Sequence, residues 1–163
     1  MSTSGPIKFT IEPARSVTDL EATRSLFTTY ATSLGLDLSF QAFDAEMASM
    51  PGKYAPPTGE ILLAHDERGA VIGCVAVRPQ PQDGCCEIKR LYVSPEGRGL
   101  GLGTALVKAI LDTARRLGYR DVRLDTLPSM VGAIALYRKA GFQPIPTHYE
   151  NPVSELLFFG RAL

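Results

Sequence analysis

The sequence predicts a mixed α/β or α+β fold built around one β-sheet, and three observations support this fold class. Segments with the alternation of a β-strand and segments with the apolar spacing of a helix are mixed along the whole chain. Such a mixture is expected to pack its helices against a single mixed sheet. The length of 163 residues suits one domain, large enough to fold without a disulfide or metal, so we expect residues 1–163 to form a single domain.

The first half of the chain is expected to contain a strand, two helices and a β-hairpin. Apolar and polar residues alternate from Ile7 until Pro13, which predicts a strand. The run Ser16–Asp19 resembles a capping box with Asp in place of Glu, and apolar residues at helical spacing follow it until Gly35. A second helix is expected after Ser39, and two runs rich in strand formers predict the hairpin. These segments are 7–13, 16–35, 39–50, 60–65 and 71–77.

The second half is expected to contain two helices and the remaining strands. The helix at 102–117 has the clearest amphipathic pattern, with Leu102, Leu106 and Ile110 on one face. Gly118 follows it at the position of a C-terminal cap. The other segments are a helix at 131–139 and strands at 86–93, 122–126, 142–145 and 155–163.

Composition excludes several classes of protein. Hydrophobic residues make up 45% of the chain and charged residues 21%, which excludes disordered, collagen-like and coiled-coil chains. Seventeen basic residues balance seventeen acidic ones, so the net charge gives no sign of a nucleic-acid or anionic-membrane partner. No stretch approaches the ~20 apolar residues of a membrane span, and the N-terminal residues lack a signal-peptide pattern. We therefore expect a cytoplasmic protein with no nucleic-acid and no membrane partner.

The cysteines and histidines do not predict a metal site. No CxxC pair is present, and neither His65 nor His148 has a neighbour at ligand spacing. Free thiols are typical of a reducing cytoplasm. Cys74 lies inside an apolar strand and is expected in the core, and nothing near Cys85 and Cys86 in sequence favours a nucleophilic thiol.

A glycine-rich turn, Arg98-Gly-Leu-Gly-Leu-Gly103, separates a predicted strand from the amphipathic helix. Its three glycines leave little side chain over the turn, and the helix start presents free N–H groups with the positive end of the helix dipole behind them. That arrangement suits a phosphate or pyrophosphate, to which Arg98 adds a cation. A plain glycine-rich connection is the alternative. A Walker loop lacks its lysine here, and a dinucleotide fingerprint would need glycine at Thr104.

Two motifs give the chain a specific resemblance. The run from Val93 through Arg98 to Gly103 resembles the acetyl-CoA motif (Arg or Gln, x, x, Gly, x, Gly or Ala) of the GNAT superfamily of N-acetyltransferases. Ala135-Leu-Tyr-Arg-Lys-Ala-Gly-Phe142 resembles the second motif of that family, and the order of elements also matches. Segments 87–93 and 123–130 resemble a bacterial subgroup. The resemblance implies a mostly antiparallel sheet of about seven strands with about four helices, splayed at the strand ending near Val93.

The resemblance also implies that acetyl-CoA is the co-substrate, and the spacing of the cysteines and histidines leads us to expect no metal. In this family the strand that ends at Val93 carries a bulge, which leaves amides free for the acetyl carbonyl and the pantetheine. Gly97 departs from the family pattern, since relatives often carry a bulky residue there, and it is expected to loosen the turn. The expected cofactor-binding residues are Leu91, Tyr92, Val93, Arg98, Gly99, Leu100, Gly101, Leu102, Gly103 and Thr104.

Acetyl transfer requires a base, because at a pKa of ~10.4 only about one amine in a thousand is neutral near pH 7. In the histone-acetylating branch the catalytic Glu lies six residues before the valine that ends this strand, as Glu87 does before Val93. Glu87 is therefore the expected base, on the same face as Lys89, Leu91 and Val93 unless a bulge intervenes. The alternatives are a surface salt bridge with Lys89 or Arg90, and a water chain or another residue as base.

Tyr137 matches the family tyrosine that protonates the leaving thiolate of coenzyme A. With a pKa near ~10, a tyrosine is protonated at neutral pH and can donate. Its alternative role is that of a core aromatic residue beside Ile134.

The acceptor is expected to enter opposite the cofactor, between the first two helices and the loop that joins the last two strands. The expected substrate-binding residues are Tyr30, Phe40, Tyr149 and Asn151. Aromatic surface with a few polar groups is typical of small-molecule pockets, and no acidic run favours a polyamine or a lysine-rich tail.

These observations predict an acetyl-CoA-dependent N-acetyltransferase, monomeric or homodimeric, that moves the acetyl group directly to a primary amine of a small molecule, such as an amino acid or related metabolite. A non-catalytic acyl-CoA sensor is an alternative, although it could dispense with Glu87 and Tyr137. Two further alternatives are a nucleotide-binding regulator and an enzyme that acetylates protein N-termini or lysines.

Overall fold

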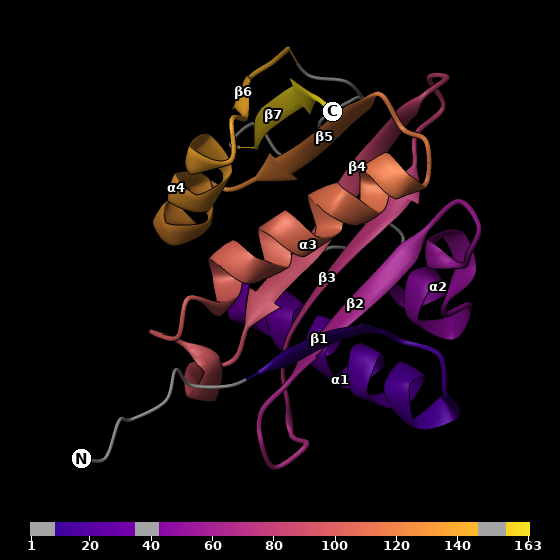
Figure 1. Ribbon diagram of the computed structural model, residues 1–163, viewed down its shortest axis with the longest axis vertical. Helices are drawn as coiled ribbons and strands as arrows, with labels where there is room; N and C mark the ends of the chain where they lie inside the picture. Colours follow the sequence, from indigo (N-terminus) through magenta and orange to yellow (C-terminus); the bar gives the residue numbers. More distant parts are fainter. Residues whose placement is uncertain (1–8, 35–42, 147–155) are drawn as a thin grey trace.

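The computed structural model describes residues 9–34, 43–146 and 156–163, which form one seven-stranded sheet with helices on both faces (Figure 1). The strand order is β1-β2-β3-β4-β5-β7-β6, and every neighbouring pair is antiparallel except β4 with β5. The predicted fold class, with its mostly antiparallel sheet and four helices, is confirmed. The strands are β1 (Thr10–Pro13), β2 (Glu60–His65), β3 (Val71–Pro79), β4 (Cys85–Val93), β5 (Asp121–Thr126), β6 (Gln143–Pro144) and β7 (Leu157–Ala162). The helices are α1 (Val17–Leu34), α2 (Phe43–Ala48), α3 (Leu102–Arg116) and α4 (Val131–Lys139), with short 3-10 turns η2 (Gly52–Tyr54) and η3 (Pro95–Gly97).

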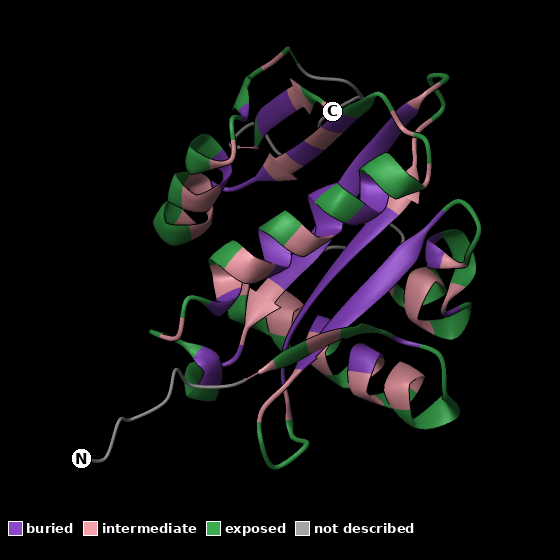
Figure 2. Cartoon of the chain, in the orientation of Figure 1, coloured by how far each residue is buried: buried purple, intermediate pink, exposed green. Residues whose placement is uncertain are grey.

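The core consists of two layers, one on each face of the sheet. The apolar stripe of α3, with Leu102, Leu106 and Ile110, packs against β2, β3 and β4 together with residues of α4. On the opposite face Phe27 of α1 and Tyr54 of η2 pack against the same central strands. Figure 2 shows the consequence, since these strands are buried along most of their length and the outer side of α3 is exposed.

The capping box predicted at the start of α1 is present. The Asp19 amide donates to Ser16 Oγ (3.0 Å), and the Ser16 amide donates back to Asp19 Oδ2 (3.2 Å). Backbone hydrogen bonds from Arg15 and Ser16 lower the pKa of Asp19. The Arg15 guanidinium also binds both carboxylate oxygens of Glu60 (2.7 and 2.8 Å), which joins the start of α1 to β2.

Strands β4 and β5 separate partway along their length. Their pairing ends where Glu87 lies beside Arg123, and the second halves of the two strands are not paired with each other. Beyond this point β4 contains a bulge, because Cys74 pairs with Tyr92 whereas Ala76 pairs with Lys89. The splay predicted near the end of this strand is confirmed. We call the region between the second halves of β4 and β5 the strand split.

Several element bounds differ from the sequence prediction. Strand β1 begins at Thr10 rather than Ile7, and Ile7 lies outside the described residues. Strand β6 has two residues instead of four; it is an edge strand, and Pro144 cannot donate to a ladder. Within the described ranges, no helix combines the length and the apolar character that a membrane crossing needs.

Candidate functional site

The turn between β4 and α3 has the backbone conformation that its glycines allow. Gly99 and Gly101 have φ angles of +79° and +76°. L residues rarely adopt this left-handed conformation, so a side chain at either position would strain the turn. Both positions have open space where a Cβ atom would stand. Backbone conformation, rather than packing, therefore requires glycine here, and the turn stays bare on its outer side.

The amides that begin α3 are available to a ligand. The helix opens with a hydrogen bond from the Ala105 amide to the Gly101 carbonyl oxygen (3.1 Å), so the amides of Leu102, Gly103 and Thr104 have no acceptor within the helix. Together with the helix dipole they suit a pyrophosphate. The exposed Arg98 side chain belongs to the same turn and donates from Nε to the Val93 carbonyl oxygen (3.3 Å).

Two further glycines fix the position of α3, and one of them corrects an expectation. Gly97 is buried, and a Cβ atom there would lie 3.0 Å from the Ile72 carbonyl oxygen and 3.1 Å from Val93 Cγ1. Gly97 therefore lets the turn pack closely on β3 and β4, and the expectation that it loosens the turn is wrong. At Gly103 a Cβ atom would lie 2.7 Å from Leu136 Cδ1, so this glycine lets α3 approach α4.

The expected cofactor contacts of two leucines are restricted to their backbone. Leu91 and Leu102 are 8% and 1% exposed, and both belong to the core beneath α3. Tyr92, Val93 and Leu100 are half-buried, so their side chains are open to a ligand in part.

The bulge in β4 changes which side chains share a face. Glu87 and Lys89 lie on the same face as Tyr92, which packs against the α1 layer. Leu91 and Val93 belong to the opposite core, beneath α3. The expected grouping of Glu87 with Leu91 and Val93 held only if no bulge intervened; the bulge is present, and its extra residue reverses the pattern after Lys89.

Glu87 belongs to a chain of largely buried ion pairs, which we call the carboxylate–guanidinium network. Its Oε1 accepts a hydrogen bond from Arg78 Nε (3.0 Å) and lies 3.0 Å from Arg78 Nη2. Arg78 Nη1 lies 3.6 Å from Glu46 Oε1, and Glu46 also accepts hydrogen bonds from Arg90 Nε (3.1 Å) and the Tyr54 hydroxyl (2.8 Å). Glu87 is 1% exposed, so the alternative of a surface salt bridge is wrong.

Sequence reasoning missed Arg78 and Glu46. Arg78 stands near the end of β3 and Glu46 in the middle of a six-residue helix, and neither belongs to a motif. Arg78 comes to lie beside Glu87 only through the register of β3 and β4.

Charged and aromatic side chains meet at the strand split on the α1 side. Lys89 Nζ lies 3.7 Å from Asp125 Oδ2, and both side chains are nearly buried. Burial lowers the pKa of Lys89, and the Asp125 carboxylate opposes that effect. The ring of Tyr30 packs edge-on against Tyr92 at 6.2 Å, and burial raises the pKa of Tyr30 to about 12.

Tyr137 reaches the strand split from the other face of the sheet. It is 6% exposed and packs edge-on against Phe142, with 5.6 Å between the ring centroids. Its hydroxyl donates no hydrogen bond to any residue of the ranges that the structure describes. Burial raises the pKa of Tyr137, and Tyr30 and Asp125 add to this effect from across the split. The hydroxyl is therefore a neutral donor without an acceptor among these residues.

The remaining expected acceptor residues cannot be placed beside Tyr30. Phe40, Tyr149 and Asn151 lie outside the described residues.

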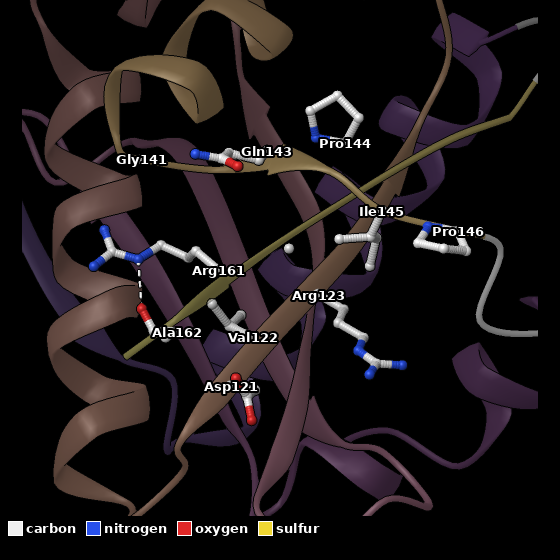
Figure 3. Close-up of a pocket in the computed structure, with 11 residues that line it drawn as sticks. Asp121, Val122, Arg123, Gly141, Gln143, Pro144, Ile145, Pro146, Arg161 and Ala162 are labelled. Carbon is white, nitrogen blue, oxygen red and sulfur yellow. Dashed lines mark hydrogen bonds between the residues drawn. The ribbon is translucent and has the colours of Figure 1, made fainter.

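An open cavity of about 720 Å³ lies away from the glycine-rich turn, over β5, β6 and β7 (Figure 3). Arg123, Arg161, Asp121 and Gln143 supply its polar lining, and Ile145 and Pro144 part of its apolar lining. Figure 3 shows the guanidinium groups of Arg123 and Arg161 pointing in different directions. No residue of the turn or of α3 lines this cavity, so it is distinct from the anion site described above.

The thiols of the chain are buried. Cys74, Cys85 and Cys86 are free, and burial raises the pKa of Cys74 and Cys86 to about 12. They are thiols rather than thiolates at neutral pH, and thiols are poor nucleophiles. Across residues 9–34, 43–146 and 156–163, no three His, Cys, Asp or Glu side chains form a group that could hold a metal ion.

Comparison with known proteins places this geometry in a family. The model of the Acetyltransferase (GNAT) family matches residues 20–142. An uncharacterized N-acetyltransferase of Schizosaccharomyces pombe is 42% identical over 153 residues, which cover 94% of each chain. A protein of Azospirillum brasilense named IAA acetyltransferase is 39% identical over 67% of this chain and 71% of its own. Among solved structures, a GNAT-family acetyltransferase of Staphylococcus aureus superimposes with a TM-score of 0.78 at 16% identity, covering 95% of this chain and 99% of that one, which shows the shared fold.

Proposed function

The chain belongs to the GNAT family of acetyltransferases, and from this premise we propose that it transfers the acetyl group of acetyl-CoA directly to a primary amine of a small molecule. The single observation that carries this proposal is the convergence of three features on the strand split. These are the bare helix start of α3, the second half of β4, which does not pair with β5, and the buried hydroxyl of Tyr137.

In this proposal the turn and the helix start bind the pyrophosphate of acetyl-CoA. The amides of residues 99–104 donate to the phosphate oxygens, and the Arg98 guanidinium adds a charge-assisted contact. The absence of side chains at Gly99 and Gly101 supports this role, since the phosphates must approach the backbone closely. The backbone of residues 91–93 binds the pantetheine and donates to the acetyl carbonyl, where negative charge develops in the transition state.

Two side chains on opposite faces of the sheet move the protons. Glu87 accepts the proton of the amine, directly or through water, because the guanidinium of Arg78 holds it as a carboxylate. Tyr137 donates a proton to the leaving thiolate, because burial keeps its hydroxyl protonated at neutral pH. The strand split supports this division of roles, since it is the place where the two faces meet.

The acceptor side is the α1 face of the split. Tyr30 and Tyr92 supply aromatic surface there, and Lys89 and Asp125 supply charge. Apolar platforms with a few oriented polar groups are typical of sites for small molecules, which favours a compact amine over a polypeptide.

The experiment that tests this function measures free thiol released from acetyl-CoA with a panel of amines, amino acids, polyamines and lysine-containing peptides. We expect thiol release with at least one small primary amine and a product acetylated on nitrogen. Turnover with peptides alone would contradict the small-molecule assignment. Binding of acetyl-CoA without turnover of any amine would favour a non-catalytic sensor instead.

A pair of variants tests the cofactor site separately. Arg98→Glu should weaken the binding of acetyl-CoA at least about tenfold in calorimetry, because it replaces a cation beside the pyrophosphate with an anion. Arg68→Glu makes the same change of charge in the exposed β2–β3 turn and should leave the affinity within about twofold. Equal affinities of the two variants would remove Arg98 from the site.

A further inference from the structure

One row of residues crosses five strands of the sheet and passes through Glu87. The register places Arg78 of β3 opposite Glu87 of β4, and Glu87 beside Arg123 of β5. Arg123 lies opposite Gly160 of β7, which in turn lies opposite Gln143 of β6. Side chains at paired positions project from the same face of a sheet. In the register Glu87 therefore stands between two arginines, one on each neighbouring strand.

The two arginines of this row differ in their partners. Glu87 pairs with Arg78, with both contacts at 3.0 Å. Arg123 forms no hydrogen bond or ion pair with any residue in the described ranges, although it is only half-exposed. In the neighbouring row, by contrast, Lys89 and Asp125 pair at 3.7 Å. Because Arg78 also lies 3.6 Å from Glu46 Oε1, Arg123 is the arginine of this row whose charge no carboxylate in the described ranges pairs.

The space beside Arg123 is open to a ligand. Arg123 lines the open cavity of about 720 Å³ shown in Figure 3, and the Ile145 side chain packs over its neighbour across the ladder, Gly160. The other guanidinium of this cavity is committed, because Arg161 Nε donates to the Ala162 carbonyl oxygen (2.8 Å), the dashed line in Figure 3. Arg123 is thus the guanidinium of the cavity that a ligand can engage with both of its donor edges.

We propose that Arg123 binds a carboxylate of the acceptor, and that the acceptor is therefore a primary amine that also carries a carboxylate, of which an amino acid is the simplest example. This inference rests on the proposed function. Arg123 lies beside Glu87 in the register, so roughly 5 Å separates the backbones of these two residues. Asp125 lies two residues further along β5, roughly 7 Å from Arg123 along the strand. A compact amino acid can therefore present its carboxylate to Arg123 and its amine to Glu87.

Matched pairs of substrates test this recognition. Amino acids are compared with their primary amides, which keep the amine and remove the negative charge. We expect kcat/KM to favour the acid over the amide, and Arg123→Gln to reduce that preference by about tenfold or more, because it removes a charge-assisted hydrogen bond to the carboxylate. Arg68→Gln removes the same charge from the exposed β2–β3 turn and should leave the preference within twofold. Arg123→Lys should retain only part of it, because an ammonium group cannot bind a carboxylate in the same bidentate manner.

A second measurement is independent of turnover. In protein labelled with ¹⁵N-arginine, the Nε–H signal of Arg123, assigned by its loss in Arg123→Lys, should shift on addition of N-acetylglycine and not of its methyl ester. An unmoved signal would overturn the inference, as would acetylation of amides and acids at equal rates. If acetyl-CoA is not consumed with any amine, the proposed function fails, and the titration of the Arg123 signal then decides the carboxylate site alone.

Discussion

Tyr137 and Glu87 are both removed from solvent, but their surroundings suit them to opposite proton transfers. Tyr137 lies among apolar side chains, which oppose formation of a phenolate and keep the hydroxyl protonated. Glu87 lies against a guanidinium, which stabilises its carboxylate. One residue can therefore donate a proton and the other can accept one at the same pH.

Replacement of Tyr137 by Phe should lower kcat about 10²–10⁴-fold and leave the KM for acetyl-CoA nearly unchanged. The hydroxyl forms no hydrogen bond within the described residues, so its loss should barely change the free energy of unfolding. Steady-state kinetics and urea unfolding measure the two effects. A kcat within about threefold of the wild-type value would make Tyr137 a packing residue.

Replacement of Glu87 by Gln should remove the acidic limb of the pH profile of kcat/KM, because an amide cannot accept the amine proton. Arg78→Gln should instead move that limb to higher pH, since it removes the cation that holds Glu87 as a carboxylate. Profiles of both variants distinguish a base from a structural ion pair. A limb at its original pH in Glu87→Gln would assign the base to another group.

The sequence could propose Glu87, Tyr137 and Arg98 as site residues because each stands at a fixed distance from a motif or within one. It could not supply Arg78, Glu46 or Arg123, since their positions beside Glu87 and Arg90 depend on strand register and on helix packing. Long-range pairing leaves no local pattern in the chain.

At the scale of elements, the bulge of β4 determines the geometry of the split. Arg90 has a φ of +61°, in the left-handed region, which costs a residue other than glycine about 1–2 kcal/mol. Two contacts offset this cost, the hydrogen bonds to Glu46 and the cation–π contact with Phe43 at 5.3 Å. Helix α2 therefore holds the bulge in place.

Substitutions of Arg90 should reverse the usual order of stability for alanine and glycine. Both Arg90→Ala and Arg90→Gly lose the contacts with α2, but only glycine adopts a positive φ without strain. Arg90→Gly should therefore be more stable than Arg90→Ala by about 1 kcal/mol in urea unfolding, whereas in a regular strand glycine is the less stable by about 0.5–1 kcal/mol. Greater stability of the alanine variant would mean that the bulge is absent in solution.

Sequence patterns predicted the elements best where local signals were strong. The capping box at Ser16–Asp19 and the amphipathic pattern of α3 correspond to observed structure, because each depends on neighbouring residues. The face of Glu87 and the length of β6 were not predictable in this way. The face of Glu87 depends on the extra residue in the β3–β4 ladder, and the length of β6 depends on its pairing with β7.

At the scale of the whole molecule, burial of a thiol makes the free energy of unfolding fall as the pH becomes alkaline. Burial raises the pKa of Cys74 from 9.0 to about 12, so above pH 9 the unfolded chain releases a proton that the folded chain retains. The stabilisation from this thiol is complete below pH 9 and is lost as the pH rises toward 12. Between pH 8 and pH 10, the wild type should lose about 1 kcal/mol more stability than Cys74→Ala. Urea unfolding at the two pH values measures the difference, and parallel losses would contradict it.

The central claim is that acetyl-CoA binds along the second half of β4 and the start of α3. The most direct test follows the backbone amide signals of ¹⁵N-labelled protein as coenzyme A is added. We predict that the largest changes occur at residues 91–93 and 99–104, whose amides would contact the pantetheine and the pyrophosphate. Changes confined to residues 121–123 and 160–162, which line the separate cavity over β5 and β7, would contradict the account.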